Sequence, residues 1–189
     1  LQRLLHELAG ERRLGSLVDS SKAETRAAIR AQRAAEARAD TFRALALRLK
    51  RMVDAGSLSV QLRDGRMVLA LPNDVLFESG SAALSKPGRE VLVAVADALR
   101  TLPDRQFQVA GHTDDRPIQT AQYPSNWELS SARALQVVRL LVGEGVPPGA
   151  LSAAAYGEFD PVAANDTAPT RAKNRRVEIT VVPTINELV

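Results

Sequence analysis

Two oppositely charged residues, Asp114 and Arg133, have the types and the spacing needed to bind a small charged molecule. Asp114 ends the tetrad Gly-His-Thr-Asp at residues 111–114, just past a predicted strand, and Arg133 lies in the helix predicted next along the chain. A carboxylate accepts hydrogen bonds from an ammonium group, and a guanidinium holds a carboxylate through two parallel hydrogen bonds. The two residues together suit a small zwitterion, and this chemistry indicates recognition rather than bond cleavage.

The helix that carries Arg133 is predicted to present further polar groups on the same side. Asn126, Ser130 and Arg133 are spaced i, i+4 and i+7, which places them on one helical face. Ser125 and Glu128 have the pattern of a capping box, so the helix is predicted to begin here. A helix N-terminus beside strand-end loops offers backbone N–H donors to an anion. We predict a small polar cleft at this junction.

Other interpretations of the same residues are open. Asp114 and Arg133 could form a salt bridge with each other across the loop–helix junction. His112, Asp114 and Ser130 are the residue types of a hydrolase triad, but no glycine-flanked nucleophile elbow surrounds Ser130, so catalysis is disfavoured. The basic run at 174–176 could bind phosphate, although support of the last strand and of the cleft wall is favoured for its two arginines.

The composition narrows the classes of site. The 189 residues contain no cysteine, which excludes disulfides and thiolate chemistry, and only two histidines, which disfavours a histidine metal cluster. A hydrophobic content of 45% is enough for one ordinary core plus an appendage. Residues 1–57 carry 12 basic and 7 acidic residues, whereas residues 58–189 carry 13 and 15. A weakly acidic globular part is therefore predicted to follow a basic segment.

The first 57 residues are predicted to be helical. From Lys22 to Ala55 there is no proline or glycine, and apolar residues recur along one broad face opposite a row of Lys and Arg. Residues 1–14 are predicted to form a separate short helix that ends near Gly15. We expect an amphipathic, coiled-coil-like stalk with a solvated basic face. Binding of nucleic acid or anionic lipid to that face is the alternative, and the lack of interleaved aromatic residues disfavours nucleic acid.

The rest of the sequence alternates predicted strands and helices. Alternating apolar residues flank Asp64-Gly65, which is a two-residue hairpin signal. Further strands are predicted at 75–77, 106–110, 151–156 and 176–182, and helices at about 85–102, 125–142 and 170–174. We predict an α+β fold, a β-α-β-α-β-β sandwich with two helices packed on one sheet face, preceded by the hairpin and by the N-terminal helical stalk.

The domain organisation follows from this pattern. We predict a stalk over residues 1–57 and a globular domain over residues 58–183, in which residues 58–74 form the hairpin extension. Residues 184–189 are predicted to be a tail.

Five short motifs occur in a recognisable order between Val75 and Val182. They are Val75-Leu76-Phe77 with Gly80-Ser81 and Leu84, Gly111-His112-Thr113-Asp114, Leu129-Ser130 with Arg133-Ala134, Tyr156-Gly157-Glu158 with Pro161, and Asn174-Arg175-Arg176-Val177-Glu178-Ile179. This stretch resembles the C-terminal domain of outer-membrane protein A and its relatives, which include the peptidoglycan-associated lipoprotein and the periplasmic part of the flagellar stator protein MotB. The longer insertion at 115–123 and the segment after it look like the MotB-type branch.

The resemblance implies an OmpA-like domain that binds peptidoglycan non-covalently at the diaminopimelate residue of its peptide stem. In the family, the aspartate of the Thr-Asp pair accepts the ligand ammonium and the arginine of the next helix clamps the ligand carboxylate. By motif position these residues are Asp114 and Arg133. The other residues that the resemblance assigns to the pocket are Thr113, Asn126 and Leu129, with Phe77 and Asn174 at its border. No catalytic residue, metal or cofactor is implied, so we expect a binding protein and not an enzyme.

The resemblance also implies a place in the cell envelope. We expect the periplasm of a Gram-negative-type bacterium and a membrane anchor upstream of Leu1, because the chain lacks an initiator Met and has the character of a processed or truncated piece. Expected partners are peptidoglycan, the membrane, and a second copy of the chain joined through the domain or the stalk, with no nucleic acid. The protein would be a cell-wall tether or part of a stator-like complex. The alternative is a structural or assembly protein whose stalk dimerises and whose domain binds another protein.

Overall fold

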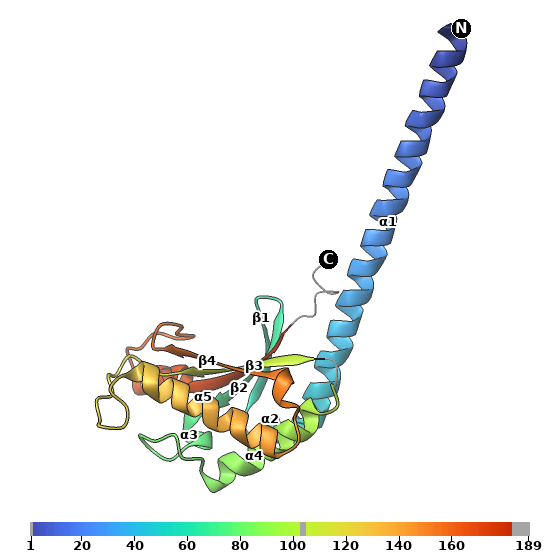
Figure 1. The fold of residues 1–189 in the computed structure, drawn as a ribbon. Helices are drawn as coiled ribbons and strands as arrows, with labels where there is room; N and C mark the ends of the chain where they lie inside the picture. Colours follow the sequence, from blue (N-terminus) through green and yellow to red (C-terminus); the bar gives the residue numbers. More distant parts are fainter. Residues whose placement is uncertain (1, 103–104, 183–189) are drawn as a thin grey trace. The chain divides into compact units, whose positions relative to one another are not determined.

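The computed structural model describes residues 2–102 and 105–182. The chain divides into two compact units, Leu1–Phe42 and Arg43–Val189. Figure 1 shows the elements of both units. None of the helices in the described ranges combines the length and the apolarity needed to cross a membrane.

The first unit consists of one long helix, α1 (Gln2–Arg48), whose last residues belong to the second unit. The separate helix predicted for residues 1–14 is wrong, because α1 continues through Gly10 and Gly15. An internal glycine costs a helix only about 1 kcal/mol relative to Ala and therefore does not end it by itself. The short helix α2 (Lys50–Asp54) follows α1 directly.

The second unit starts before the hairpin. Leu45 and Leu49 are each only 1% exposed and Leu58 is 3% exposed, so the end of α1 and the segment after α2 contribute side chains to the core. The compact unit therefore begins at Arg43, upstream of residue 58, where the sequence predicts the globular domain to begin.

The predicted hairpin is confirmed. Strand β1 (Ser59–Arg63) pairs antiparallel with β2 (Arg66–Pro72). The two turn residues, Asp64 and Gly65, both have positive φ angles of 51° and 72°. A two-residue turn with both φ angles positive matches the twist of the flanking strands, which explains the Asp-Gly pair.

The strand predicted at 75–77 is wrong, because Val75 and Leu76 belong to a single helical turn, α3 (Asn73–Leu76), and Phe77 follows it. Asn73, Leu76 and Phe77 are buried, a helical i, i+3, i+4 pattern that a short apolar run does not distinguish from a strand. Only one isolated bridge, between Phe77 and Leu84, retains strand character here. The turn brings Asn73 and Phe77 to the place where the site forms.

The sheet and its helices have the predicted α+β arrangement. Five strands run in the order β1-β2-β5-β3-β4, with β3 and β4 parallel and the other neighbours antiparallel. Two helices, α4 and α5, lie on the same face of this sheet (Figure 1). The remaining bounds are α4 (Lys86–Leu99), β3 (Gln106–His112), α5 (Asn126–Gly143), the 3-10 turn η1 (Pro148–Ala150), β4 (Leu151–Gly157), α6 (Ala168–Asn174) and β5 (Arg176–Val182).

A close contact between β3 and α5 sets the geometry of the site. A Cβ atom added at Gly111 would lie 2.1 Å from the carbonyl oxygen of Ser130, so only glycine allows the strand to approach the helix this closely. Because Gly111 is three residues before Asp114 and Ser130 is three residues before Arg133, the same contact brings the two charged residues to one end of the domain.

Candidate functional site

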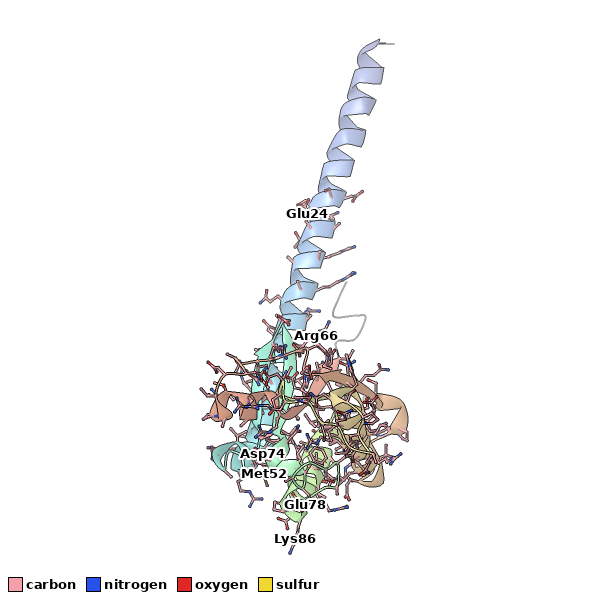
Figure 2. The ribbon with its side chains drawn as sticks, turned by 90° about the vertical axis from the view of Figure 1, so that its left-hand side faces the viewer. Glu24, Met52, Arg66, Asp74, Glu78 and Lys86 are labelled. Carbon is pink, nitrogen blue, oxygen red and sulfur yellow. The ribbon has the colours of Figure 1, made fainter. Side chains whose placement is uncertain are left out.

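A cleft of about 580 Å³ lies where α3, the loop after β3 and the first turns of α5 meet. Figure 2 shows two of its acidic residues, Asp74 and Glu78, in the lower half of the globular unit, with Arg66 near the top of that unit. The residues that line the cleft are Asn73, Asp74, Phe77, Glu78, Ser79, Gly80, Thr113, Asp114, Arg116, Pro117, Ile118, Asn126, Leu129, Arg133 and Arg175. A polar cleft at the junction of a strand end and a helix start is what the sequence predicts.

Most of the residues predicted for the site line this cleft, namely Asp114, Arg133, Thr113, Asn126, Leu129 and Phe77. Asn174 does not. Its side chain is fully buried, and its Oδ1 accepts hydrogen bonds from the backbone N–H groups of Val162 (2.9 Å) and Ala163 (3.0 Å). Asn174 therefore shapes the loop after β4, and the cleft border expected for it is formed by the next residue, Arg175.

Asp114 presents a nearly buried carboxylate to the cleft, with 7% of its surface exposed. Its Oδ2 accepts a hydrogen bond from Nη1 of Arg175 at 2.9 Å, and its Oδ1 accepts one from the backbone N–H of Arg116 at 3.2 Å. The partner of Asp114 is thus Arg175, and the salt bridge with Arg133 that the sequence left open is not formed. An ionised carboxylate has about four acceptor positions, so Asp114 retains capacity for a ligand ammonium.

Arg133 is a buried cation without a carboxylate partner among the described residues. Its Nε donates to the carbonyl oxygen of Ser81 at 3.0 Å, and its guanidinium carbon lies 5.2 Å from the centroid of the Phe77 ring. Burial lowers the pKa of Arg133 from its ordinary value, although an arginine remains protonated. A carbonyl and an aromatic face leave most of its five N–H donors unused. Arg133 can therefore take a carboxylate from a ligand.

Arg175 is the cleft residue with the most ionic contacts. In addition to its bond to Asp114, its Nη2 donates to Oδ2 of Asp74 at 2.8 Å, and the hydrogen bonds to Asp74 and then Asp114 raise its pKa. The backbone N–H of Asn73 donates to the carbonyl oxygen of Arg175 at 2.9 Å, which ties α3 to the end of α6. The sequence indicated Arg175 as support for the cleft wall, but nothing in it pointed to Asp74.

Asn126 connects the cleft loop to α5. Its Nδ2 donates to the carbonyl oxygen of Arg116 at 3.1 Å and to the carboxylate of Glu158. The side chain is only 5% exposed, so these bonds hold the loop after Asp114 against the first turn of the helix.

The cap of α5 differs in detail from the predicted capping box. The helix begins at Asn126, and Ser125 Oγ accepts a hydrogen bond from the N–H of Trp127 at 3.2 Å. The Ser125 hydroxyl donates to the Glu128 carboxylate, and this hydrogen bond lowers the pKa of Glu128. Ser125 therefore caps the helix, as the sequence predicts, and its side chain is also hydrogen-bonded to that of Glu128.

The ionisable groups that line the cleft balance one another. Three are acidic (Asp74, Glu78 and Asp114) and three are arginines (Arg116, Arg133 and Arg175), so their formal charges cancel. A neutral cleft with separate positive and negative groups disfavours a simple anion or cation, since neither finds a net opposite charge. A ligand with both charges satisfies both groups. The cleft is thus suited to a zwitterion.

His112, Asp114 and Ser130 do not form a hydrolase triad. The Ser130 hydroxyl is fully buried, donates to the carbonyl oxygen of Trp127 at 3.1 Å and accepts from the N–H of Gly157 at 3.2 Å. The His112 side chain lies beside Asp160 and Glu178. The serine therefore fixes α5 against the end of β4.

The buried His112 lies in a cluster with the partly exposed Asp160 and the buried Glu178, and the possible ligand atoms of the three residues all fall within 4.8 Å of one another, as a metal site would need. Both carboxylates already have cationic partners: Arg63 bonds to Asp160 and, at 3.0 Å, to Glu178, and Arg176 Nε bonds to Glu178 at 2.6 Å. A metal ion here would face two guanidinium groups. We therefore assign the cluster a structural role.

The free energy of unfolding is expected to decrease as the pH is lowered, because of His112. Burial, followed by repulsion from Arg176, lowers the pKa of His112 from 6.5 to about 4. The unfolded chain then binds this proton at a higher pH than the folded protein does, so the contribution is complete above pH 6.5 and is lost as the pH falls toward 4. The difference corresponds to about 3 kcal/mol of unfolding free energy.

Urea unfolding at several pH values between 7.5 and 4 measures this effect. The variant His112→Gln lacks the pH-dependent contribution of the histidine, so its free energy of unfolding should depend less on pH over the same range. Equal pH dependence in the two proteins would show that His112 is not the titrating group.

Comparison with known proteins agrees with the fold. Residues 76–175 match the OmpA family, and the chain belongs to this family. Motility protein B of Bacillus subtilis is 34% identical over 127 residues, which are 67% of this chain and 49% of that protein. The resemblance to OmpA-like domains of the MotB-type branch is confirmed.

Two further relatives carry informative descriptions. Peptidoglycan-binding protein ArfA of Mycobacterium tuberculosis is 37% identical over 107 residues, 57% of this chain and 32% of that protein. The solved cell wall anchor of the T6SS from Pseudomonas aeruginosa is 41% identical with a TM-score of 0.69, and the match covers 74% of this chain and 97% of that chain. The chain spans about half the length of Motility protein B and a smaller share of ArfA.

Proposed function

We propose that this chain binds peptidoglycan non-covalently, through the diaminopimelate residue of the peptide stem. The observation that carries the proposal is Arg133, a buried guanidinium without a carboxylate partner in the described residues, in the same neutral cleft as the carboxylate of Asp114. The similarity to a protein described as peptidoglycan-binding and to one described as a cell wall anchor supports peptidoglycan as the ligand.

In the proposed complex, the free end of diaminopimelate carries both charges on one carbon and lies between Asp114 and Arg133. Its ammonium bonds to Asp114, sharing that carboxylate with Arg175, and its carboxylate accepts hydrogen bonds from Arg133. The neighbouring polar and apolar contacts come from Thr113, Asn126, Leu129 and Phe77, which line the cleft. Each charge-assisted hydrogen bond contributes about 1.5–3 kcal/mol before the cost of association.

Binding of this kind needs no bond cleavage, because the polymer itself is the anchorage. A single site of about micromolar to millimolar affinity is sufficient when many copies of the ligand repeat along a polymer, since multivalency prolongs attachment. The proposed role is a tether in the cell envelope, with the unit that begins at Arg43 as the binding domain and the helix of the first unit as the stalk. We further propose a periplasmic location, a homodimer, and attachment to a membrane or to a stator-like complex.

Cosedimentation with purified sacculi that contain diaminopimelate tests the proposal. The full chain should pellet with sacculi, and free diaminopimelate should release it. A chain that stays in the supernatant at low and high sacculus concentration would contradict the proposed function.

A further inference from the structure

Two aromatic rings lie stacked on the surface close to the cleft. Trp127 is 46% exposed and Phe159 is 67% exposed, and their ring centroids are 5.5 Å apart at an interplanar angle of 26°. The whole chain has only seven aromatic residues, and Phe77, Phe107 and Tyr123 are buried. Leaving two large rings together in water, in a chain so poor in aromatic residues, is typical of a contact surface.

The Trp127–Phe159 platform is held in place before any ligand arrives. Trp127 is the second residue of α5, and Phe159 closes the turn after β4 with a backbone hydrogen bond from its N–H to the carbonyl oxygen of Tyr156 at 3.1 Å. The start of α5 lies beside the end of β4 (Figure 1), and both rings pack over Gly157, where an added Cβ would lie 3.7 Å from each. Rings fixed in this way lose little conformational entropy when a ligand binds.

The platform adjoins the cleft through the residues that precede each ring. Asn126, which lines the cleft, immediately precedes Trp127. Glu158, whose carboxylate accepts a hydrogen bond from Asn126, immediately precedes Phe159. A ligand held between Asp114 and Arg133 can therefore extend from the cleft past Asn126 onto the two rings.

We infer that the Trp127–Phe159 platform is a second subsite, which binds a sugar ring of the glycan strand to which the peptide stem is attached. This inference rests on the proposed function. The axial C–H groups of a pyranose form an apolar face that stacks on aromatic rings, while its hydroxyl groups stay in water. Such a ligand suits a pair of half-exposed aromatic rings better than a closed apolar pocket. Diaminopimelate is the third residue of the stem, so on the order of 10 Å of extended chain separates it from the sugar.

Two soluble ligands test the inference with the full chain: a disaccharide-peptide that contains diaminopimelate, and the same peptide without sugar. The wild-type chain should bind the disaccharide-peptide about tenfold more tightly than the free peptide. Because Trp127 is the only tryptophan in the chain, the disaccharide-peptide should change its fluorescence emission, whereas the free peptide should not.

Substitution of the rings should remove only the preference for sugar. Phe159→Ala and the double variant Trp127→Ala/Phe159→Ala should bind both ligands with the affinity that wild type has for the free peptide. Unchanged binding of the free peptide also shows that the variants are folded. Leu135→Ala is the matched control, since Leu135 is an apolar α5 residue that is 44% exposed, and it should keep the preference. A wild type without preference, or a preference that survives in both ring variants, overturns the subsite. Failure to bind either ligand overturns the proposed function together with it.

Discussion

Replacement of Arg133 by alanine is expected to weaken binding to peptidoglycan about 100-fold. The substitution removes the buried guanidinium that has no carboxylate partner among the described residues, and a bidentate pair of charge-assisted hydrogen bonds to the ligand carboxylate disappears with it. The measurement is the fraction of full chain that pellets with sacculi over a range of sacculus concentrations. Arg133 also contacts Phe77 and Ser81, so the substitution could affect folding. Circular dichroism and thermal unfolding are the control, and they should show that the variant is folded.

Arg139→Ala is the matched control for Arg133. Arg139 lies on the same helix but is exposed and does not line the cleft, so its loss should leave binding unchanged. Arg133→Lys keeps the charge without the planar fork, and it should fall between wild type and Arg133→Ala. If Arg133→Ala bound sacculi as tightly as wild type, the cleft would not be the binding site.

The substitution Asp114→Asn is expected to weaken binding at least tenfold. The side chain keeps its shape but loses the charge that attracts the ligand ammonium, and a charge-assisted hydrogen bond becomes a neutral one. Removal of one carboxylate leaves the cleft, whose formal charges otherwise cancel, with a net positive charge, and Arg175 loses one of its two carboxylate partners. The same cosedimentation measurement applies.

Asp115→Asn is the control for Asp114. Asp115 is the neighbouring residue, exposed and outside the lining of the cleft, so removal of its charge should not change binding. If the two variants lost affinity equally, general electrostatic attraction and not a specific ammonium site would be the cause.

Local sequence signals predicted much of the fold. Asp64-Gly65 marks the hairpin turn because that turn requires positive φ angles at both residues, and Ser125 marks the start of α5 because it caps the helix. The segment at 75–77 was misassigned because three apolar residues fit either a strand or a helical turn. Gly15 did not end a helix because glycine lowers helix stability only modestly.

The site was predictable only as far as its motifs extend along the chain. Asp114 and Arg133 stand in recognisable segments, and the structure brings both to one cleft. The pairing of Asp114 with Arg175 and of Arg175 with Asp74 depends on how α3 packs beside the end of α6, and that contact between distant segments has no local signal. For the same reason no local signal places Trp127 half-exposed against Phe159.

Competition between small molecules and sacculi for the full chain tests the central claim most directly. Diaminopimelate carries ammonium and carboxylate groups on the same carbons, pimelate has only the carboxylates, and cadaverine has only the ammonium groups. If Asp114 and Arg133 together hold a zwitterion, diaminopimelate should release the chain from sacculi, and the other two should not at the same concentration. Release by pimelate as effective as release by diaminopimelate would contradict the account, as would retention on sacculi at saturating diaminopimelate.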